Sequence, residues 1–165
     1  VPGYDYWRIR GDMIYRRDTE KDFSSYYPKD AREFHMLYLL GKGKIKDVLL
    51  MPTPPSQFPE FWKILLMWRH NIEEWKELAM VFAEKNRENS SMTLISLVIL
   101  GEISADDARK QIYKVSHELD PIFFLVLAEQ YRRDKNIANA RVCYTKAVGE
   151  SPNIYKRAIQ YFENH

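Results

Sequence analysis

Residues 120–152 decide the fold, and they read DPIFFLVLAEQYRRDKNIANARVCYTKAVGESP. At each end, a side chain that can cap a helix precedes a proline, in Asp120-Pro121 and in Ser151-Pro152. Because proline is favoured at the first helical position, both pairs predict the start of a helix. Helical segments joined by short loops form antiparallel hairpins, so this stretch predicts a helical hairpin followed by a further helix.

The residue types within this hairpin also fit a repeat. When Pro121 is position one of a unit of about 34 residues, eight signature positions hold an acceptable residue type. These are Phe124, Leu127, Ala128, Tyr131, Ala140, Tyr144, Ala147 and Pro152. Small residues let two helices approach closely, and aromatic residues fill the space between neighbouring hairpins. The stretch therefore resembles a tetratricopeptide (TPR) repeat. A weaker unit is predicted upstream from Ser96, Ile99, Ala108, Ile112 and Val115.

The rest of the chain indicates an all-α protein with an irregular beginning. Residues 1–27 hold aromatic residues and arginines without a period, which favours an N-terminal arm. Residues 28–165 are expected to form one TPR-like helical-hairpin solenoid, with a break near 52–57 where three prolines exclude helix. Outside the hairpin, helices are expected from the cap Asp30 to Gly41 and Gly43, over 45–50, over 59–69, over 72–85 with Asn71 as cap, from Ser90 or Ser91 to about 100, and over 104–119 with Ser104 as cap.

Composition excludes several classes of protein. With 165 residues, 45% hydrophobic and 29% charged, the chain can bury one core and is neither disordered nor collagen-like. Cys143 is the single cysteine and permits no intramolecular disulfide, and no apolar stretch reaches the ~20 residues that cross a bilayer. Because the sequence begins with Val1 and shows no secretory leader, we expect a piece of a longer intracellular protein, in the cytoplasm with the nucleus as a second location.

The distribution of charge gives little support to nucleic-acid binding. Residues 1–57 hold 10 Lys/Arg against 8 Asp/Glu, whereas residues 58–165 hold 15 of each. No run exceeds two basic residues. Strong nucleic-acid binding usually needs a basic face, because each neutralised phosphate requires a cation.

No catalytic, cofactor or metal site is predicted. The four histidines are dispersed, and no pair has the spacing of a helical zinc site. The glycines on either side of Lys42 follow no strand, so they predict a turn at a helix end rather than a phosphate loop. Paired carboxylates such as Glu73-Glu74 fall in first helical turns, where they complement the helix dipole. We therefore expect a protein that is not an enzyme and that buries Cys143 inside a helical pair.

Three binding hypotheses are considered. The first is a protein-interaction and self-association module, because solenoids leave concave and end surfaces that partners use. Its candidate contacts are aromatic or apolar residues of the middle of the chain: Phe61, Trp62, Trp68, Trp75, Leu97 and Val98. The apolar helix that holds the last two could equally be covered by its own neighbours.

The alternative hypothesis is RNA binding by the N-terminal arm. Aromatic rings can stack on bases and arginines can meet phosphates, and the arm offers Tyr6, Trp7, Arg8 and Arg10. The same rings could instead pin the arm to the helical body. A third hypothesis, capture of an acidic chain end, does not fit the clear repeat. TPR proteins that do this resemble one another in using lysine at position five and asparagine at position nine, where this chain has Leu125 and Glu129.

Two groups of residues resemble a known scaffold domain. The first group is Phe34-His35, Leu37, Leu39, Gly41 or Gly43, Lys46, Val48 and Leu49, and the second is Asp120-Pro121, Arg133-Asp134, Ala138, Ala140, Cys143-Tyr144 and Ala147. Over roughly residues 13–162 they resemble the TPR-like domain of the largest Gemin, the WD-repeat subunit of the SMN complex. The resemblance implies homodimerisation through helices of the domain and a scaffold role in assembling RNA–protein particles or in translation. It assigns no individual interface residue, and the prolines at 52–55 have no counterpart in that family.

Overall fold

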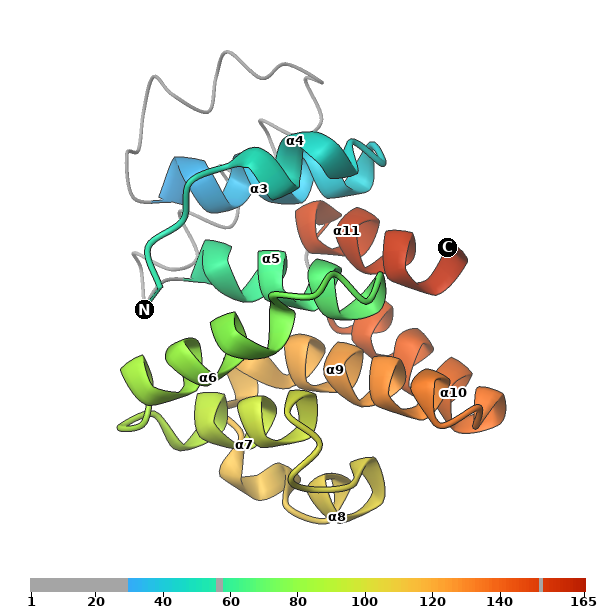
Figure 1. The fold of residues 1–165 in the computed structure, drawn as a ribbon. Helices are drawn as coiled ribbons and strands as arrows, with labels where there is room; N and C mark the ends of the chain where they lie inside the picture. The colour runs from blue at the N-terminus through green and yellow to red at the C-terminus, as the bar shows by residue number, and fades with distance from the viewer. Residues whose placement is uncertain (1–29, 56–57, 152) are drawn as a thin grey trace. The chain divides into compact units, whose positions relative to one another are not determined.

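The computed structural model describes residues 30–55, 58–151 and 153–165 (Figure 1). These residues are all-helical and contain no β-strand, which confirms the predicted class. None of the described helices is long and apolar enough to cross a lipid bilayer. The chain divides into two compact units, one of residues 1–51 with 151–165 and the other of residues 52–150. The sequence predicted one helical domain over residues 28–165 with a break near 52–57. The boundary at Pro52 lies where the prolines begin, and residues 52–55 form no helix.

The first unit brings together helices from the two ends of the chain. It contains α3 (Asp30–Gly41), α4 (Ile45–Leu50) and α11 (Asn153–Asn164), and α11 packs against α3. Leu37 of α3 and Phe162 of α11 are fully buried. The hydroxyl of Tyr155 donates a hydrogen bond to Glu33 Oε1 at 3.1 Å. Two segments far apart in the sequence therefore form one small core.

The second unit is a series of helices that pack one against the next. α5 (Phe58–Arg69) packs against α6 (Trp75–Lys85), and α6 packs against α7 (Ser90–Ile99). α7 also contacts α9 (Asp120–Arg133), which packs against α10 (Ile137–Gly149). Between α7 and α9 lie α8 (Ala105–Arg109) and two short 3₁₀ helices, η1 (Ile112–Lys114) and η2 (His117–Leu119). Large side chains of α5 and α9 fill the core, among them Phe61, Trp62, Leu65, Leu66, Trp68 and Phe123.

α9 and α10 approach each other through small residues. Ala128 on α9, and Ala140 and Ala147 on α10, are at most 2% exposed. The larger signature residues of the described part of the repeat are also buried: Phe124, Leu127, Tyr131 and Tyr144. Because alanines let two helix backbones come close, a bulkier side chain at one of these positions would push the helices apart.

Four helices end in the same hydrogen-bonded turn, the Schellman motif. In this motif the residue after the cap takes a left-handed backbone conformation, and here these residues are Gly43, Asn71, Gly101 and Lys135. The following N–H donates to a carbonyl in the last helical turn, as from Ile72 to Met67 at 2.9 Å and from Asn136 to Tyr131 at 2.8 Å. Glycine and asparagine favour this conformation, but lysine does not.

One predicted helix start is wrong, and another is confirmed with a cap that was not predicted. Asn71 does not cap the helix that follows, because it closes the turn after α5, and α6 begins at Trp75 rather than at residue 72. α7 begins at Ser90, as predicted, and its cap is Asn89, whose side chain accepts a hydrogen bond from Met92 N at 3.1 Å. Asparagine can fill both roles, so its residue type alone does not decide between them.

The helix predicted over residues 104–119 is also wrong in its extent. Ser104 caps α8 as predicted, but this helix ends at Arg109. After α8, the backbone at residues 114 and 116 bonds to α7 instead. The Ser91 hydroxyl of α7 donates to the Lys114 carbonyl at 3.2 Å and accepts from the Ser116 N–H at 2.6 Å. These bonds occupy backbone groups that a continuous helix would pair internally, so a contact with α7 overrides the local helical preference.

The small-residue contact between α9 and α10 gives a first prediction. Replacing Ala140 by leucine should lower the free energy of unfolding by about 1–3 kcal/mol, because overpacking forces the helices apart. Ala138→Leu, on the exposed side of the same helix, is the matched control and should change it by less than about 0.5 kcal/mol. Urea unfolding followed by circular dichroism measures both. Equal stabilities of the two variants would contradict the close packing at Ala140.

Candidate functional site

The six residues predicted to contact a protein partner do not share one exposed surface. Trp75 and Leu97 are half-buried, on α6 and α7. The other four are at most 1% exposed: Phe61, Trp62, Trp68 and Val98. Fully buried side chains contribute to the core and offer no area to a partner in this conformation. The predicted RNA contacts Tyr6, Trp7, Arg8 and Arg10 lie outside the described residues.

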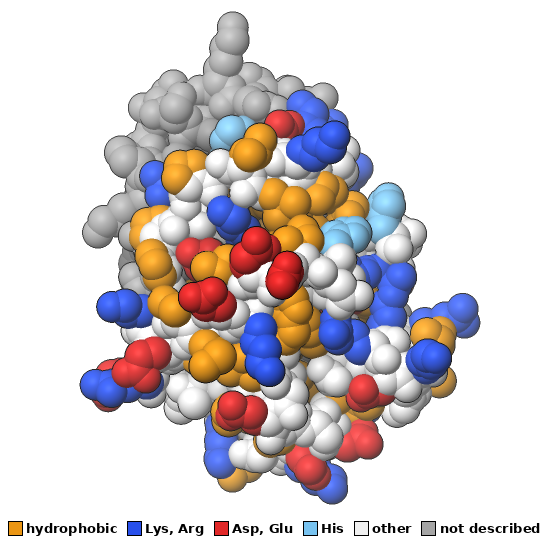
Figure 2. Space-filling model, in the orientation of Figure 1, with side chains coloured by type: hydrophobic (Ala, Val, Ile, Leu, Met, Phe, Trp, Pro, Cys, Tyr) orange, Lys and Arg blue, Asp and Glu red, His pale blue; other side chains and the backbone are white. Residues whose placement is uncertain are grey.

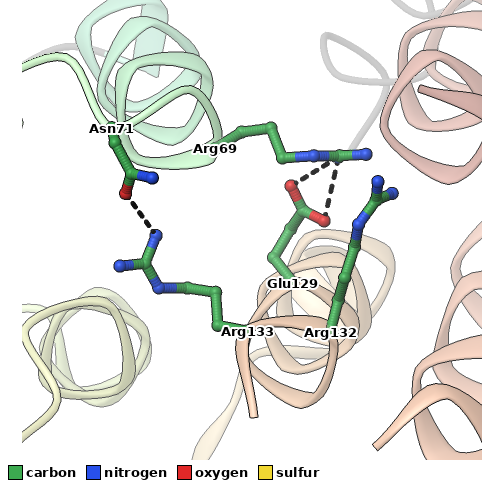
Figure 3. Close-up of a pocket in the computed structure, with 5 residues that line it drawn as sticks. All are labelled: Arg69, Asn71, Glu129, Arg132 and Arg133. Carbon is green, nitrogen blue, oxygen red and sulfur yellow. Dashed lines mark hydrogen bonds and ion pairs between the residues drawn. The ribbon is translucent and has the colours of Figure 1, made fainter. Parts of the chain in front are cut away.

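A polar pocket lies in the second unit, where α5 and α9 end (Figure 3). It has a volume of about 360 Å³. Its lining consists of Arg69 and Asn71 from the end of α5, and of Glu129, Arg132 and Arg133 from the last turns of α9. The C-terminal end of a helix carries a partial negative charge, so arginines are favourable there. We call this site the arginine pocket.

Glu129 forms the buried side of the arginine pocket. Its side chain is 2% exposed, and Arg69 Nη1 donates to both carboxylate oxygens, at 2.8 Å and 3.1 Å. The hydroxyl of Tyr144, on α10, donates to Glu129 Oε2. Burial raises the pKa of Glu129 above its ordinary value, and the Arg69 charge and the two hydrogen bonds counteract part of that rise. Burial likewise raises the pKa of Tyr144, so its hydroxyl stays a donor.

Arg133 is held in place on the other side of the pocket. Its guanidinium lies over the ring of Trp68, 5.1 Å from the ring centroid, and 5.9 Å from that of Trp75. Its Nη1 donates to the Trp68 carbonyl at 2.9 Å and to Asn71 Oδ1 at 3.3 Å. The two tryptophans predicted as partner contacts therefore fix an arginine, through cation–π contacts that such rings favour.

The charges of the arginine pocket suit an anion. Three arginines and one glutamate give it a net charge of +2 when Glu129 is ionised. Guanidinium groups only donate hydrogen bonds, and their planar fork matches carboxylate and phosphate oxygens. Among the described residues, no group of three histidine, cysteine, aspartate or glutamate side chains could hold a metal ion.

Sequence reasoning did not identify the residues of this pocket. Two signals were present in α9, a glutamate within a run of apolar residues and the Arg132-Arg133 pair at its end. A charged residue on a buried helix face requires a buried partner. The partner, Arg69, lies 60 residues away in the sequence, so no local pattern connects it to Glu129.

Comparison of the chain with protein-family models, with curated proteins and with solved structures found no match. The function of the chain is therefore inferred from the residues and contacts described above. Of these, the arginine pocket is the site whose charges and geometry specify a class of ligand. The exposed apolar residues of α10 are the second surface to consider.

The raised pKa of Glu129 predicts how pH affects stability. Between 4.5, the ordinary value, and the higher value in the folded protein, the folded state binds more protons than the unfolded state. The contribution of Glu129 to the free energy of unfolding should therefore fall as pH rises through this interval. Glu129→Gln keeps the shape of the side chain but cannot titrate. Urea unfolding of both proteins from about pH 4 to pH 8 should show the wild type losing stability relative to the variant. Parallel pH profiles would contradict the shift.

Proposed function

We propose that this chain is a non-catalytic protein-interaction module of TPR-like helical hairpins, and that it self-associates. The observation that carries the proposal is the exposed apolar surface of α10. Ile137 is 50% exposed and Val142 is 51% exposed. Covering such side chains removes apolar area from water, which favours association.

The two sides of α10 differ in a way that supports this proposal. Ala140, Cys143 and Ala147 are buried and follow one another at spacings of three and four. The outer face of α10 consists of seven exposed residues: Ile137, Ala138, Arg141, Val142, Thr145, Lys146 and Gly149. In solenoids each hairpin packs against the next, so an outer face with two charges, on Arg141 and Lys146, and two large exposed apolar side chains suits a further hairpin or a second copy of this chain.

Other parts of the proposal have narrower support. The burial of the small signature residues on α9 and α10 supports a TPR-like arrangement of these two helices. Catalysis is not proposed, because Glu129 is engaged by Arg69 and Tyr144 rather than positioned to exchange protons with a substrate. The wider role, a cytoplasmic scaffold in the assembly of RNA–protein particles, rests on the sequence resemblance alone.

Light scattering coupled to size exclusion tests self-association directly. The measurement is made at several protein concentrations, in buffer near physiological salt. We expect a mass near twice 19.7 kDa for the wild type. Val142→Glu should shift the mass toward 19.7 kDa, because a charge buried in an apolar contact costs several kcal/mol, roughly 2–5.

Met80→Glu is the matched control for this experiment. Met80 is a large apolar residue, 57% exposed, on α6 rather than on α10. The control variant should keep the wild-type mass. A monomeric wild type at every concentration would contradict self-association. If Met80→Glu dissociates the dimer and Val142→Glu does not, the contact does not lie on the outer face of α10.

A further inference from the structure

We propose that the arginine pocket binds an acidic segment of a protein partner, with one carboxylate at Arg132 and a second at Arg133. This inference rests on the proposed function as a protein-interaction module and names the chemistry of its partner. It uses a different surface from self-association, since the pocket lies at the ends of α5 and α9 and the outer face of α10 carries the apolar contact.

Charge complementarity is the first argument. The pocket carries a net charge of +2 with Glu129 ionised, and more when that residue is protonated. Acidic side chains of a partner complement this positive charge. The volume of about 360 Å³ exceeds what a single small ion needs and lies within the range of sites that hold part of a larger ligand.

The placement of the arginines is the second argument. Successive residues of an α-helix diverge by about 100° around its axis. Figure 3 accordingly shows Arg132 and Arg133 on opposite sides of Glu129. Two separated guanidinium groups suit two separated carboxylates better than one compact phosphate. A short peptide that passes over Glu129 can present acidic side chains to both.

Preorganisation is the third argument. Arg133 is exposed, yet its guanidinium is fixed by Trp68, Trp75 and Asn71. Both of its hydrogen bonds to described residues come from Nη1, which leaves Nη2 and Nε as donors for a ligand. An arginine that is already fixed loses less side-chain entropy on binding, so its hydrogen bonds contribute more to affinity.

The charges of the second unit favour a protein partner over RNA. Residues 52–150 hold 13 Lys/Arg and 14 Asp/Glu, which makes the unit slightly acidic. Figure 2 shows acidic and basic side chains interspersed among the described residues of the face drawn, without a continuous basic stripe. A nucleic-acid strand needs such a stripe along its phosphates, whereas two carboxylates need only a local pair of arginines.

Fluorescence anisotropy with labelled, end-blocked peptides tests the proposal on the full chain. The probes hold two glutamates separated by one, two or three serines, and the matched probes hold glutamine instead. We expect at least one glutamate peptide to bind, its glutamine counterpart to bind at least about tenfold more weakly, and affinity to fall with added salt. Because the ends are blocked, no terminal carboxylate contributes.

Variants connect binding to the two arginines. Arg132→Gln and Arg133→Gln should each weaken binding about tenfold, and Arg133→Lys should fall between the wild type and the glutamine variant because it keeps the charge but loses the fork. Arg87→Gln, which removes an exposed charge from the turn between α6 and α7, is the matched control and should bind as the wild type does. Circular dichroism confirms that each variant is folded.

Three outcomes would overturn the proposal. Equal binding of glutamate and glutamine peptides would show that the pocket does not recognise the carboxylates. Tighter binding of a single-phosphoserine peptide, or of a twelve-nucleotide single-stranded RNA, would identify phosphate as the ligand group. If no peptide binds while light scattering still shows a dimer, the acidic partner is wrong and the interaction module stands.

A fourth result separates the two proposals. If the peptides bind and the chain is monomeric, the acidic partner is supported and self-association is wrong.

Discussion

One buried carboxylate determines much of the second unit. Glu129 is almost completely buried on α9, among apolar residues that would make an unpaired charge very unfavourable. α5 therefore has to bring Arg69, and α10 has to bring Tyr144, within hydrogen-bonding distance. A single side chain thereby restricts how three helices lie. Arg69 is also the last residue of α5, so the ion pair lies directly before the turn that Asn71 closes.

This constraint also accounts for the pocket. Because Arg69 is engaged by Glu129, the arginines at the end of α9 form the open sides of the site. Arg133 is held over Trp68, and its bond to the Trp68 carbonyl satisfies an acceptor at the end of α5. The ion pair that stabilises the unit and the arginines proposed to bind a partner are thus different side chains of one cluster.

The helical hairpin and the arginine pocket differ in how far local sequence determines them. Pro121 and the small residues Ala128, Ala140 and Ala147 act on neighbouring turns, and for this reason their positions were predictable. The Arg69–Glu129 pair spans 60 residues, and the bonds from Ser91 that interrupt the helix expected over 104–119 span more than 20. Such contacts have no local signature. The aromatic residues of α5 were expected to contact a partner, whereas Trp68 faces the core and holds the guanidinium of Arg133 over its ring.

The central claim is that Arg69 and Glu129 stabilise the second unit as a pair, and a double-mutant cycle tests it most directly. The free energy of unfolding would be measured near pH 7 for the wild type, Arg69→Met, Glu129→Gln and the double variant. We predict that the double variant loses less stability than the two single losses added together, with a coupling energy of about 1–3 kcal/mol, because each single change leaves the other charge buried without its opposite charge. Losses that add to within about 0.5 kcal/mol would show that the two residues act independently and would contradict this account.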